Sequence, residues 1–236
     1  MSTFEQALGL TKKPIAIGFF DDGPPAGVEQ WTGGAVPAGC AFWREAWEGR
    51  TFYTVPADHC NCAVGAYTHR IDQPPERETA LNDTIGFMIS SGYLQMSEVP
   101  MIPVLPKAPK YVAYGPAEER RFRTDVVVIA ANPASMMLIY EAALRSGVGN
   151  IATPALGRPA CAVLPMAINS GSTALSFGCK GNRTFTGLPE AELYLAIPGV
   201  KWDAVADALR TIADANATMA AHYKQHEATV RGLATT

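Results

Sequence analysis

Short apolar runs alternate with longer amphipathic stretches along the whole chain, and turn-forming residues separate them. The run at residues 15–20 follows Pro14 and stops at Asp, Gly and Pro, which is typical of a buried strand. Residues 51–55 are rich in β-branched and aromatic side chains and indicate a second strand. Shorter apolar stretches at 160–164 and 174–177 predict two more strands.

Two longer units combine a strand with a helix directly after it. The apolar run 126–130 leads into Asn132 and Pro133, a helix N-cap followed by proline at the first helical position. The second unit pairs a strand at 193–197 with a long helix over about 201–223. Apolar positions in this helix recur mostly every three or four residues and predict one buried stripe. The stripe consists of Trp202, Val205, Leu209, Ile212, Met219 and Tyr223.

A third amphipathic stretch, residues 79–91, predicts a helix that ends before Gly92. Its apolar face carries Leu81, Ile85, Met88 and Ile89. The order of elements favours an α/β protein of the α+β type, with a mixed β-sheet packed by helices, because the strands between 160 and 197 are joined by loops too short for crossover helices. No linker-like composition interrupts the chain, so we expect a single domain over residues 1–236.

Composition and charge exclude several classes of protein. The formal net charge is −3, and a nucleic-acid-binding protein would usually need a basic face to release phosphate counterions. No apolar run approaches the roughly 20 residues that cross a bilayer, and the N-terminal segment lacks the features of a signal peptide. We therefore expect a cytoplasmic protein with no nucleic-acid or membrane partner. In that reducing compartment the five cysteines are expected as thiols or metal ligands, not as disulfides.

The densest group of reactive side chains lies between His59 and His69, which flank Cys60 and Cys62. Thiolates and imidazoles at such spacing can share a soft metal ion, whereas a Cys-x-Cys pair does not easily close a disulfide on itself. The alternative is that a buried cysteine acts as a small apolar side chain while the histidines make local hydrogen bonds.

A second cysteine, Cys179, is framed by Gly178 and Gly181. Glycine lets the backbone approach a ligand closely, and Lys180 and Arg183 nearby would lower the pKa of the thiol. The alternative is an ordinary turn in which the cysteine is incidental.

Other sequence features favour a site less strongly. His222 and His226 stand four residues apart on the last predicted helix, but the glutamate of the zinc-protease motif is missing between them. No serine-hydrolase elbow, phosphate-binding loop or dinucleotide-binding motif occurs. Methionine-rich stretches are expected in the core.

Several stretches in combination resemble the widespread bacterial and archaeal family known as domain of unknown function 169, over nearly the full length. These stretches are residues 61–69, 156–161, 178–188, 192–194 and 197–199. The resemblance implies that Cys62, Cys161 and Cys179 occupy motif positions. Cys60 falls where an aromatic residue is expected and Ala63 where proline is expected, so Cys60 ranks as a bystander. The family carries no reaction that could be transferred to this chain.

The leading hypothesis is a cysteine-ligated metalloprotein with a redox or sulfur-handling role. Four thiolates match the ligand count of an iron-sulfur cluster or of a zinc site, although here they are spread widely along the chain and the fold must bring them together. The expected metal ligands are Cys40, Cys62, Cys161 and Cys179. Asn61, His69, Lys180 and Arg183 are expected to contact the cofactor, for which an iron-sulfur cluster comes first and zinc or haem are alternatives.

Two rival hypotheses stay open. In the first, the chain is a binding module that encloses a small organic molecule or haem among its glycine-rich loops and aromatic side chains. In the second, it is a metal-free thiol enzyme with Cys62 or Cys179 as nucleophile and His69 as base. A small molecule or a redox protein is the expected partner, and the sequence indicates neither a substrate nor an oligomeric state.

Overall fold

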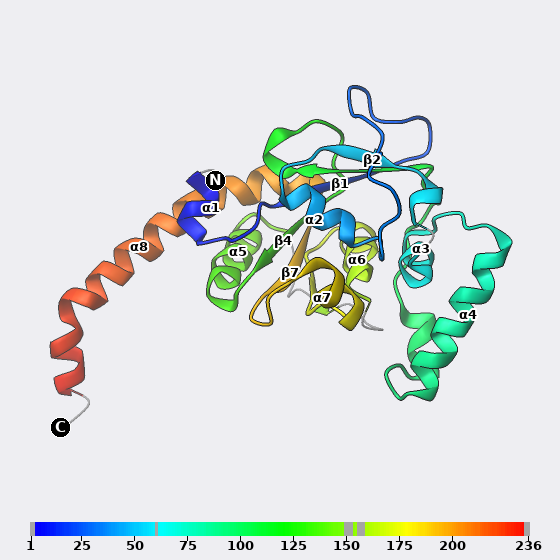
Figure 1. Cartoon of the computed structure of the whole chain (residues 1–236). Helices are drawn as coiled ribbons and strands as arrows, with labels where there is room; N and C mark the ends of the chain where they lie inside the picture. The colour runs from blue at the N-terminus through cyan, green and yellow to red at the C-terminus, as the bar shows by residue number, and fades with distance from the viewer. Residues whose placement is uncertain (1–2, 60, 149–152, 155–158, 234–236) are drawn as a thin grey trace.

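The computed structural model describes residues 3–59, 61–148, 153–154 and 159–233, which form one seven-stranded sheet in the order β2-β3-β1-β4-β7-β6-β5 (Figure 1). Neighbouring strands are antiparallel except β5 and β6, which are parallel. The predicted mixed sheet is therefore confirmed. The strands are β1 (Ile15–Phe20), β2 (Phe52–Thr54), β3 (Tyr111–Pro116), β4 (Val126–Ala131), β5 (Thr153–Pro154), β6 (Ala174–Ser176) and β7 (Leu193–Pro198).

Helices and short 3-10 turns connect the strands. The helices are α1 (Thr3–Leu8), α2 (Ala41–Trp47), α3 (Ala63–His69), α4 (Pro75–Ser90), α5 (Pro133–Arg145), α6 (Val163–Ser170), α7 (Lys180–Thr186) and α8 (Trp202–Leu233). The 3-10 turns are η1 (Pro56–His59), η2 (Met96–Met101), η3 (Ala117–Glu119), η4 (Ala160–Ala162) and η5 (Gly199–Lys201).

Side chains of the central strands alternate between two apolar layers, as a pleated strand requires. On β4, Val126, Val128 and Ala130 belong to the layer that packs against α2, α3 and α6. Val127 and Ile129 belong to the opposite layer, which packs against α1, α5 and α8. Helices thus cover both faces of the sheet, and the predicted α+β architecture with a helix-packed sheet is confirmed.

The unit formed by β4 and α5 follows the sequence prediction closely. The Asn132 carboxamide oxygen accepts a hydrogen bond from the Ser135 backbone N–H at 3.0 Å, while Pro133 occupies the first turn. The helix ends before Ser146 and Gly147, and Gly147 takes a left-handed φ of 64°. Capping residues at both ends of a periodic apolar segment therefore define its limits.

The predicted strand at 160–164 is wrong, because these residues form η4 and the start of α6. Alanine, leucine and methionine are strong helix formers, and a helix that is buried on all sides shows no polar face. A short apolar run of this kind cannot be distinguished from a buried strand by its pattern. The neighbouring prediction at 174–177 is confirmed as β6.

Helix α4 lies outside the sheet and the helices that cover its two faces, beside α3 (Figure 1). It begins at Pro75, earlier than the pattern indicated, and ends at Ser90. All of α4 is among the described residues, and none of them is buried. Its apolar face therefore packs less completely than the face of a core helix, and it borders the cavity described below.

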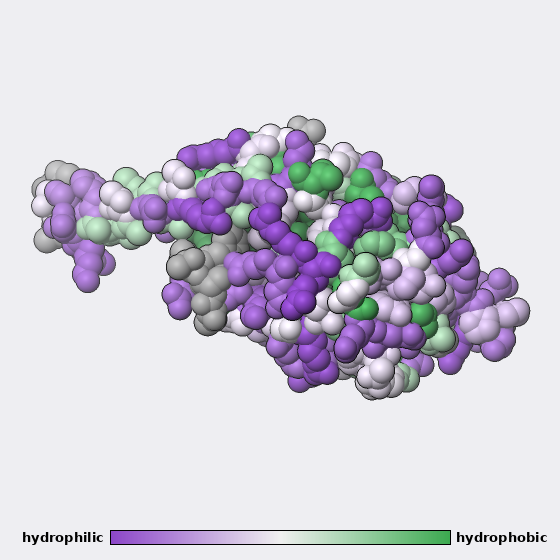
Figure 2. Space-filling view, turned by 90° about the horizontal axis from the view of Figure 1, so that it is seen from above, coloured by the Kyte–Doolittle hydropathy of each residue, from purple (hydrophilic) through white to green (hydrophobic). Residues whose placement is uncertain are grey.

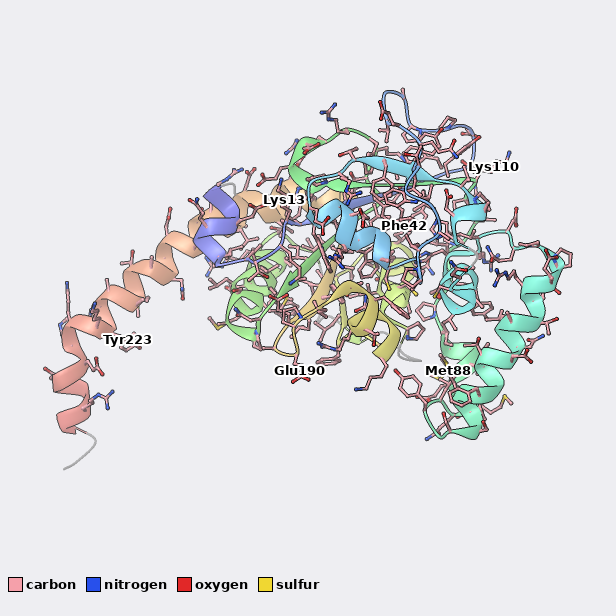
Figure 3. The ribbon with its side chains drawn as sticks, viewed as in Figure 1. Lys13, Phe42, Met88, Lys110, Glu190 and Tyr223 are labelled. Atoms are coloured by element: carbon pink, nitrogen blue, oxygen red, sulfur yellow. The ribbon has the colours of Figure 1, made fainter. Side chains whose placement is uncertain are left out.

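Helix α8 leaves the body of the protein in its second half (Figure 1). Trp202, Val205, Leu209 and Ile212 are buried, whereas Met219 is 49% and Tyr223 is 59% exposed. The predicted burial of the stripe is therefore wrong beyond Ile212, and Figure 3 shows Tyr223 on the projecting part. Within the described part of the chain, no helix is long and apolar enough to cross a membrane. Seen from above, hydrophilic residues cover most of the surface and apolar patches are small (Figure 2).

Candidate functional site

Four cysteines from distant parts of the sequence line one cavity of about 240 Å³, which we call the sulfur-lined pocket. They are Cys40, Cys62, Cys161 and Cys179, and all four are free thiols. The pocket lies where the N-terminal ends of α2, α3 and α7 meet the η4 turn, and residues of α4 form its outer wall.

Three of these cysteines occupy N-cap positions of short helices. Cys40 precedes α2, Cys62 precedes α3 and Cys179 precedes α7. The Cys62 Sγ accepts a hydrogen bond from the Gly65 N–H, and the Cys179 Sγ accepts one from the Asn182 N–H, both at 3.3 Å. Backbone N–H groups in a first helical turn have no partner within the helix, so the sulfur replaces the hydroxyl of a serine cap. These hydrogen bonds fix the direction of both thiols.

Gly65 makes room for two sulfur atoms at once. A β-carbon at this position would stand 3.1 Å from the Cys62 Sγ and 3.9 Å from the Cys161 Sγ. The two sulfurs are therefore no farther apart than the sum of these distances. The Cys161 Sγ also lies 3.6 Å from the Thr68 hydroxyl.

Burial keeps three of the thiols protonated. It raises the pKa of Cys40 from 9.0 to about 12, and the nearby Asn182 side chain opposes this shift only in part. Burial also raises the pKa of Cys62, and it raises the pKa of Cys161 well above its ordinary value. The proximity of the other cysteines adds to each shift. These groups are thus neutral and weakly polar at neutral pH.

Two buried histidines form part of the inner wall. Burial lowers the pKa of His59 to about 3 and the pKa of His69 to about 4, so both imidazoles are neutral at physiological pH. The His69 Nε2 lies 3.3 Å from the Cys161 carbonyl oxygen, which can only accept a hydrogen bond. That nitrogen therefore carries the proton. The His59 Nε2 lies 2.8 Å from the Thr54 hydroxyl.

The prediction of a cysteine-ligated metalloprotein is wrong. Among the described residues, no group of three or more His, Cys, Asp or Glu side chains is arranged to hold a metal ion. Three of the thiols begin separate helices and all four stand around a cavity, whereas zinc ligands converge to about 2.3 Å from one ion. Cys60, the fifth cysteine, lies outside the described residues.

Asn61 and Lys180, two residues predicted to contact a cofactor, lie in the pocket wall with His69. The Asn61 amide donates a hydrogen bond to the Val36 carbonyl at 2.8 Å. The fourth residue, Arg183, uses its guanidinium to bind the backbone, and its partners are the carbonyl oxygens of Phe177, Pro189 and Glu192. Arg183 therefore holds the two ends of the α7 segment together.

Asn182 is a pocket residue that the sequence interpretation missed. It is 1% exposed, and neither its Nδ2 nor its Oδ1 has a hydrogen-bond partner of normal geometry among the described residues. Its side chain lies next to the Cys40 thiol and the Tyr194 hydroxyl, where it lowers the pKa of both groups against the larger, opposite effect of burial. An unsatisfied buried amide costs about 1–3 kcal/mol, which marks this turn as more than simple packing. The feature of the sequence that could have indicated Asn182 is its place three residues after Cys179, the residue that caps α7.

The outer wall of the pocket is apolar and aromatic. Helix α4 contributes Leu81, Ile85 and Met88, and Figure 3 shows Met88 on the side of α4 that faces α7. The Lys180 backbone N–H lies 3.5 Å from the Tyr93 hydroxyl, which connects α7 to the segment after α4. Phe185, on α7, is another aromatic residue of this wall.

Comparison with known proteins identifies the family and no more. The chain matches the family described as domain of unknown function 169, uncharacterised ArCR, over residues 3–208. No curated protein and no solved structure matches the chain. The match includes the sheet, all residues of the sulfur-lined pocket and the packed first turns of α8. The chain belongs to this family, and the family predicted from the sequence motifs is confirmed.

Proposed function

We propose that this member of the domain of unknown function 169 family binds a small, largely apolar organic molecule in the sulfur-lined pocket. The observation that carries the proposal is the convergence of Cys40, Cys62, Cys161 and Cys179 with the apolar face of α4 around one cavity. The proposal assigns binding only; it assigns no reaction to the thiols.

The size of the cavity supports a binding role over a packing defect. Protein interiors are close-packed and contain few voids larger than a water molecule. The pocket of about 240 Å³ is larger than an engineered apolar cavity of about 150 Å³ that binds benzene. If the number of ligand atoms scales with cavity volume from benzene, a ligand of roughly ten non-hydrogen atoms would fill the pocket. This is below the roughly 300–1,000 Å³ of pockets for drug-sized ligands, which favours a small molecule.

The incomplete burial of α4 is a second argument. Leu81, Ile85 and Met88 point toward the pocket, yet each remains partly exposed. Apolar surface removed from water stabilises a complex by about 25 cal/mol per Å². A ligand between α4 and the cysteines would therefore bury apolar surface on both sides.

Neutral thiols suit such a ligand better than they suit nucleophilic catalysis. Un-ionised sulfur is polarisable and contacts aromatic rings with about 0.3–1.5 kcal/mol of stabilisation. The raised pKa of Cys62 reduces its thiolate fraction, and the His69 Nε2 proton is already directed to the Cys161 carbonyl. These contacts disfavour Cys62 as the nucleophile of the thiol-enzyme hypothesis.

The proposal is tested with fluorobenzene as probe and fluorine NMR as readout. We expect saturable binding to the wild-type protein and its loss in Thr84→Trp, because Thr84 lines the pocket from a helix without buried residues. Asp83→Trp is the matched control, since Asp83 is an exposed neighbour that does not line the pocket. Absence of binding to the wild-type protein, or equal binding to Thr84→Trp, would contradict the proposal.

A further inference from the structure

We infer that the ligand of the sulfur-lined pocket is a small organic carboxylate, with its charged group at Lys180 and its apolar part against the thiols. This inference rests on the proposed function and adds the chemical class of the ligand. It is carried by the charges of the pocket wall and by the position of Lys180 at the start of α7.

The described residues of the pocket wall include one side chain that is charged at neutral pH, and this is Lys180. No aspartate or glutamate belongs to the described part of the wall. The other nitrogen bases are His59 and His69, and burial keeps both neutral. The net charge presented to a ligand is therefore positive, and an organic cation would be repelled.

The ammonium group of Lys180 is available to a ligand. Among the described residues, it makes no ion pair with a carboxylate, and its side chain is exposed. By contrast, Lys12 pairs with Glu192 at 2.7 Å and Arg183 is bound to backbone carbonyls. Within the described part of the pocket wall, Lys180 is thus a cation whose donors are available to a ligand.

Backbone contacts fix the position of the Lys180 main chain. Its N–H lies 3.5 Å from the Tyr93 hydroxyl, and its neighbour Cys179 points its sulfur into the helix cap. The first turn of α7 carries the ammonium of Lys180 and the buried Asn182 amide, whose polar atoms have no hydrogen-bond partner among the described residues. The walls contributed by α3 and α4 are largely apolar. This division orients a ligand with its polar end toward α7 and its apolar end toward α3 and α4.

The size of the pocket and its single charged donor group favour a carboxylate over a phosphate ester as the ligand. A pocket for roughly ten non-hydrogen atoms leaves space for one ring and one small anionic group. A single ammonium is a point charge that matches one carboxylate, whereas phosphate sites generally combine several donors. The attraction between one ammonium and one carboxylate near the protein surface corresponds to about a tenfold gain in affinity, which we expect from the charge.

The test compares three ligands of similar size, namely benzoate, benzyl alcohol and benzylamine, by isothermal titration calorimetry at low salt. In the wild-type protein, benzoate is expected to bind about tenfold more tightly than benzyl alcohol, and benzylamine most weakly. In Lys180→Met this preference disappears while affinity for benzyl alcohol is retained, because methionine preserves the aliphatic part of the side chain. High salt reduces the preference for benzoate in the wild-type protein.

Lys224→Met is the matched control, since it makes the same change of charge on the exposed second half of α8. It is expected to keep the wild-type preference for benzoate. Equal affinity for benzoate and benzyl alcohol in the wild-type protein would overturn the inference while the proposed function stands. An unchanged preference in Lys180→Met would also overturn it, and failure of all three ligands and of fluorobenzene to bind would reject the proposed function itself.

Discussion

The Gly65 backbone N–H donates a hydrogen bond to the Cys62 sulfur at 3.3 Å. The missing side chain of the same glycine leaves the space that the Cys161 sulfur approaches from another segment. Gly65 thus donates to the sulfur that caps the start of α3 and permits two thiols to stand close together. A glycine inside a helix costs about 1 kcal/mol relative to alanine, so its presence here indicates that the space is used.

Gly65→Ala is expected to couple energetically to Cys62. Alanine favours the helix by about 1 kcal/mol, but its β-carbon would stand 3.1 Å from the Cys62 Sγ and force the sulfur aside. We expect the substitution to stabilise a Cys62→Ala protein by about 0.5–1 kcal/mol and to give no gain, or a loss, in the wild-type protein. Urea unfolding of the four proteins measures this coupling. An identical effect in both backgrounds would show that the contact carries no strain.

The thiols are expected to react with iodoacetamide in two classes, measured by mass spectrometry in a Cys60→Ser protein. Cys62 and Cys179 are half-buried and react first, whereas Cys40 and Cys161 are each 8% exposed and react slowly. Because burial raises the pKa of Cys62, its rate should still be rising with pH above the ordinary thiol value of 9.0. Fluorobenzene should slow both fast reactions. Uniform rates for all four thiols would contradict the arrangement of the pocket.

Sequence patterns predicted the elements whose ends carry caps and whose faces are periodic. The unit from Val126 through α5 is the clearest case, because Asn132 and Pro133 mark the helix start. Helices α2, α3 and α7 were not predicted, since each has only seven residues and two of them contain glycine or threonine where apolar periodicity would be sought. Their positions depend on packing between distant segments, which no local pattern encodes.

The sequence predicted which cysteines form the candidate site, but the role predicted for them was wrong. Cys62, Cys161 and Cys179 were recognised as motif residues, and they do line one pocket. Their residue type suggested ligands for a metal, but helix caps and burial direct the sulfurs to backbone donors and apolar neighbours. Asn182 belongs to a recognised motif but was not predicted as a site residue, because the cost of an unsatisfied amide becomes visible only when burial is known.

Arg183→Met is expected to destabilise the protein by about 2 kcal/mol, because hydrogen bonds from a charged donor contribute about 1.5–3 kcal/mol each when buried and most of those made by Arg183 are exposed to solvent, which weakens them. The guanidinium spans the carbonyls of Phe177, Pro189 and Glu192, and its loss frees the α7 segment from both flanking loops. Urea unfolding measures the change, and affinity for fluorobenzene should fall with it.

Arg210→Met is the control for Arg183, since Arg210 is exposed and, among the residues that the structure describes, pairs with the exposed Asp207 of its own helix alone. Such surface pairs contribute about 0–1 kcal/mol. Arg183→Lys should rescue little, because an ammonium cannot reproduce the fork of donors. Equal stability losses for Arg183→Met and Arg210→Met would show that the carbonyl contacts contribute nothing specific.

Acid should destabilise the protein through its two buried histidines. The folded-state pKa is about 3 for His59 and about 4 for His69, below the ordinary value of 6.5, so the unfolded chain binds protons first as the pH falls. The stability that depends on the neutral imidazoles is fully present above pH 6.5 and is lost progressively as the pH falls toward the folded-state values. Between about pH 7.5 and about pH 5, each histidine should remove about 2 kcal/mol from the free energy of unfolding.

His69→Phe tests this origin through the pH dependence of stability, because phenylalanine removes the titration and fills a similar volume. Although the loss of the contact with the Cys161 carbonyl lowers stability at every pH, the difference between about pH 7.5 and about pH 5 should shrink by about 2 kcal/mol. His226→Gln, on the exposed part of α8, should leave that difference unchanged. Urea unfolding at the two pH values measures it, and a His69→Phe protein with the full wild-type dependence would place the acid sensitivity in other groups.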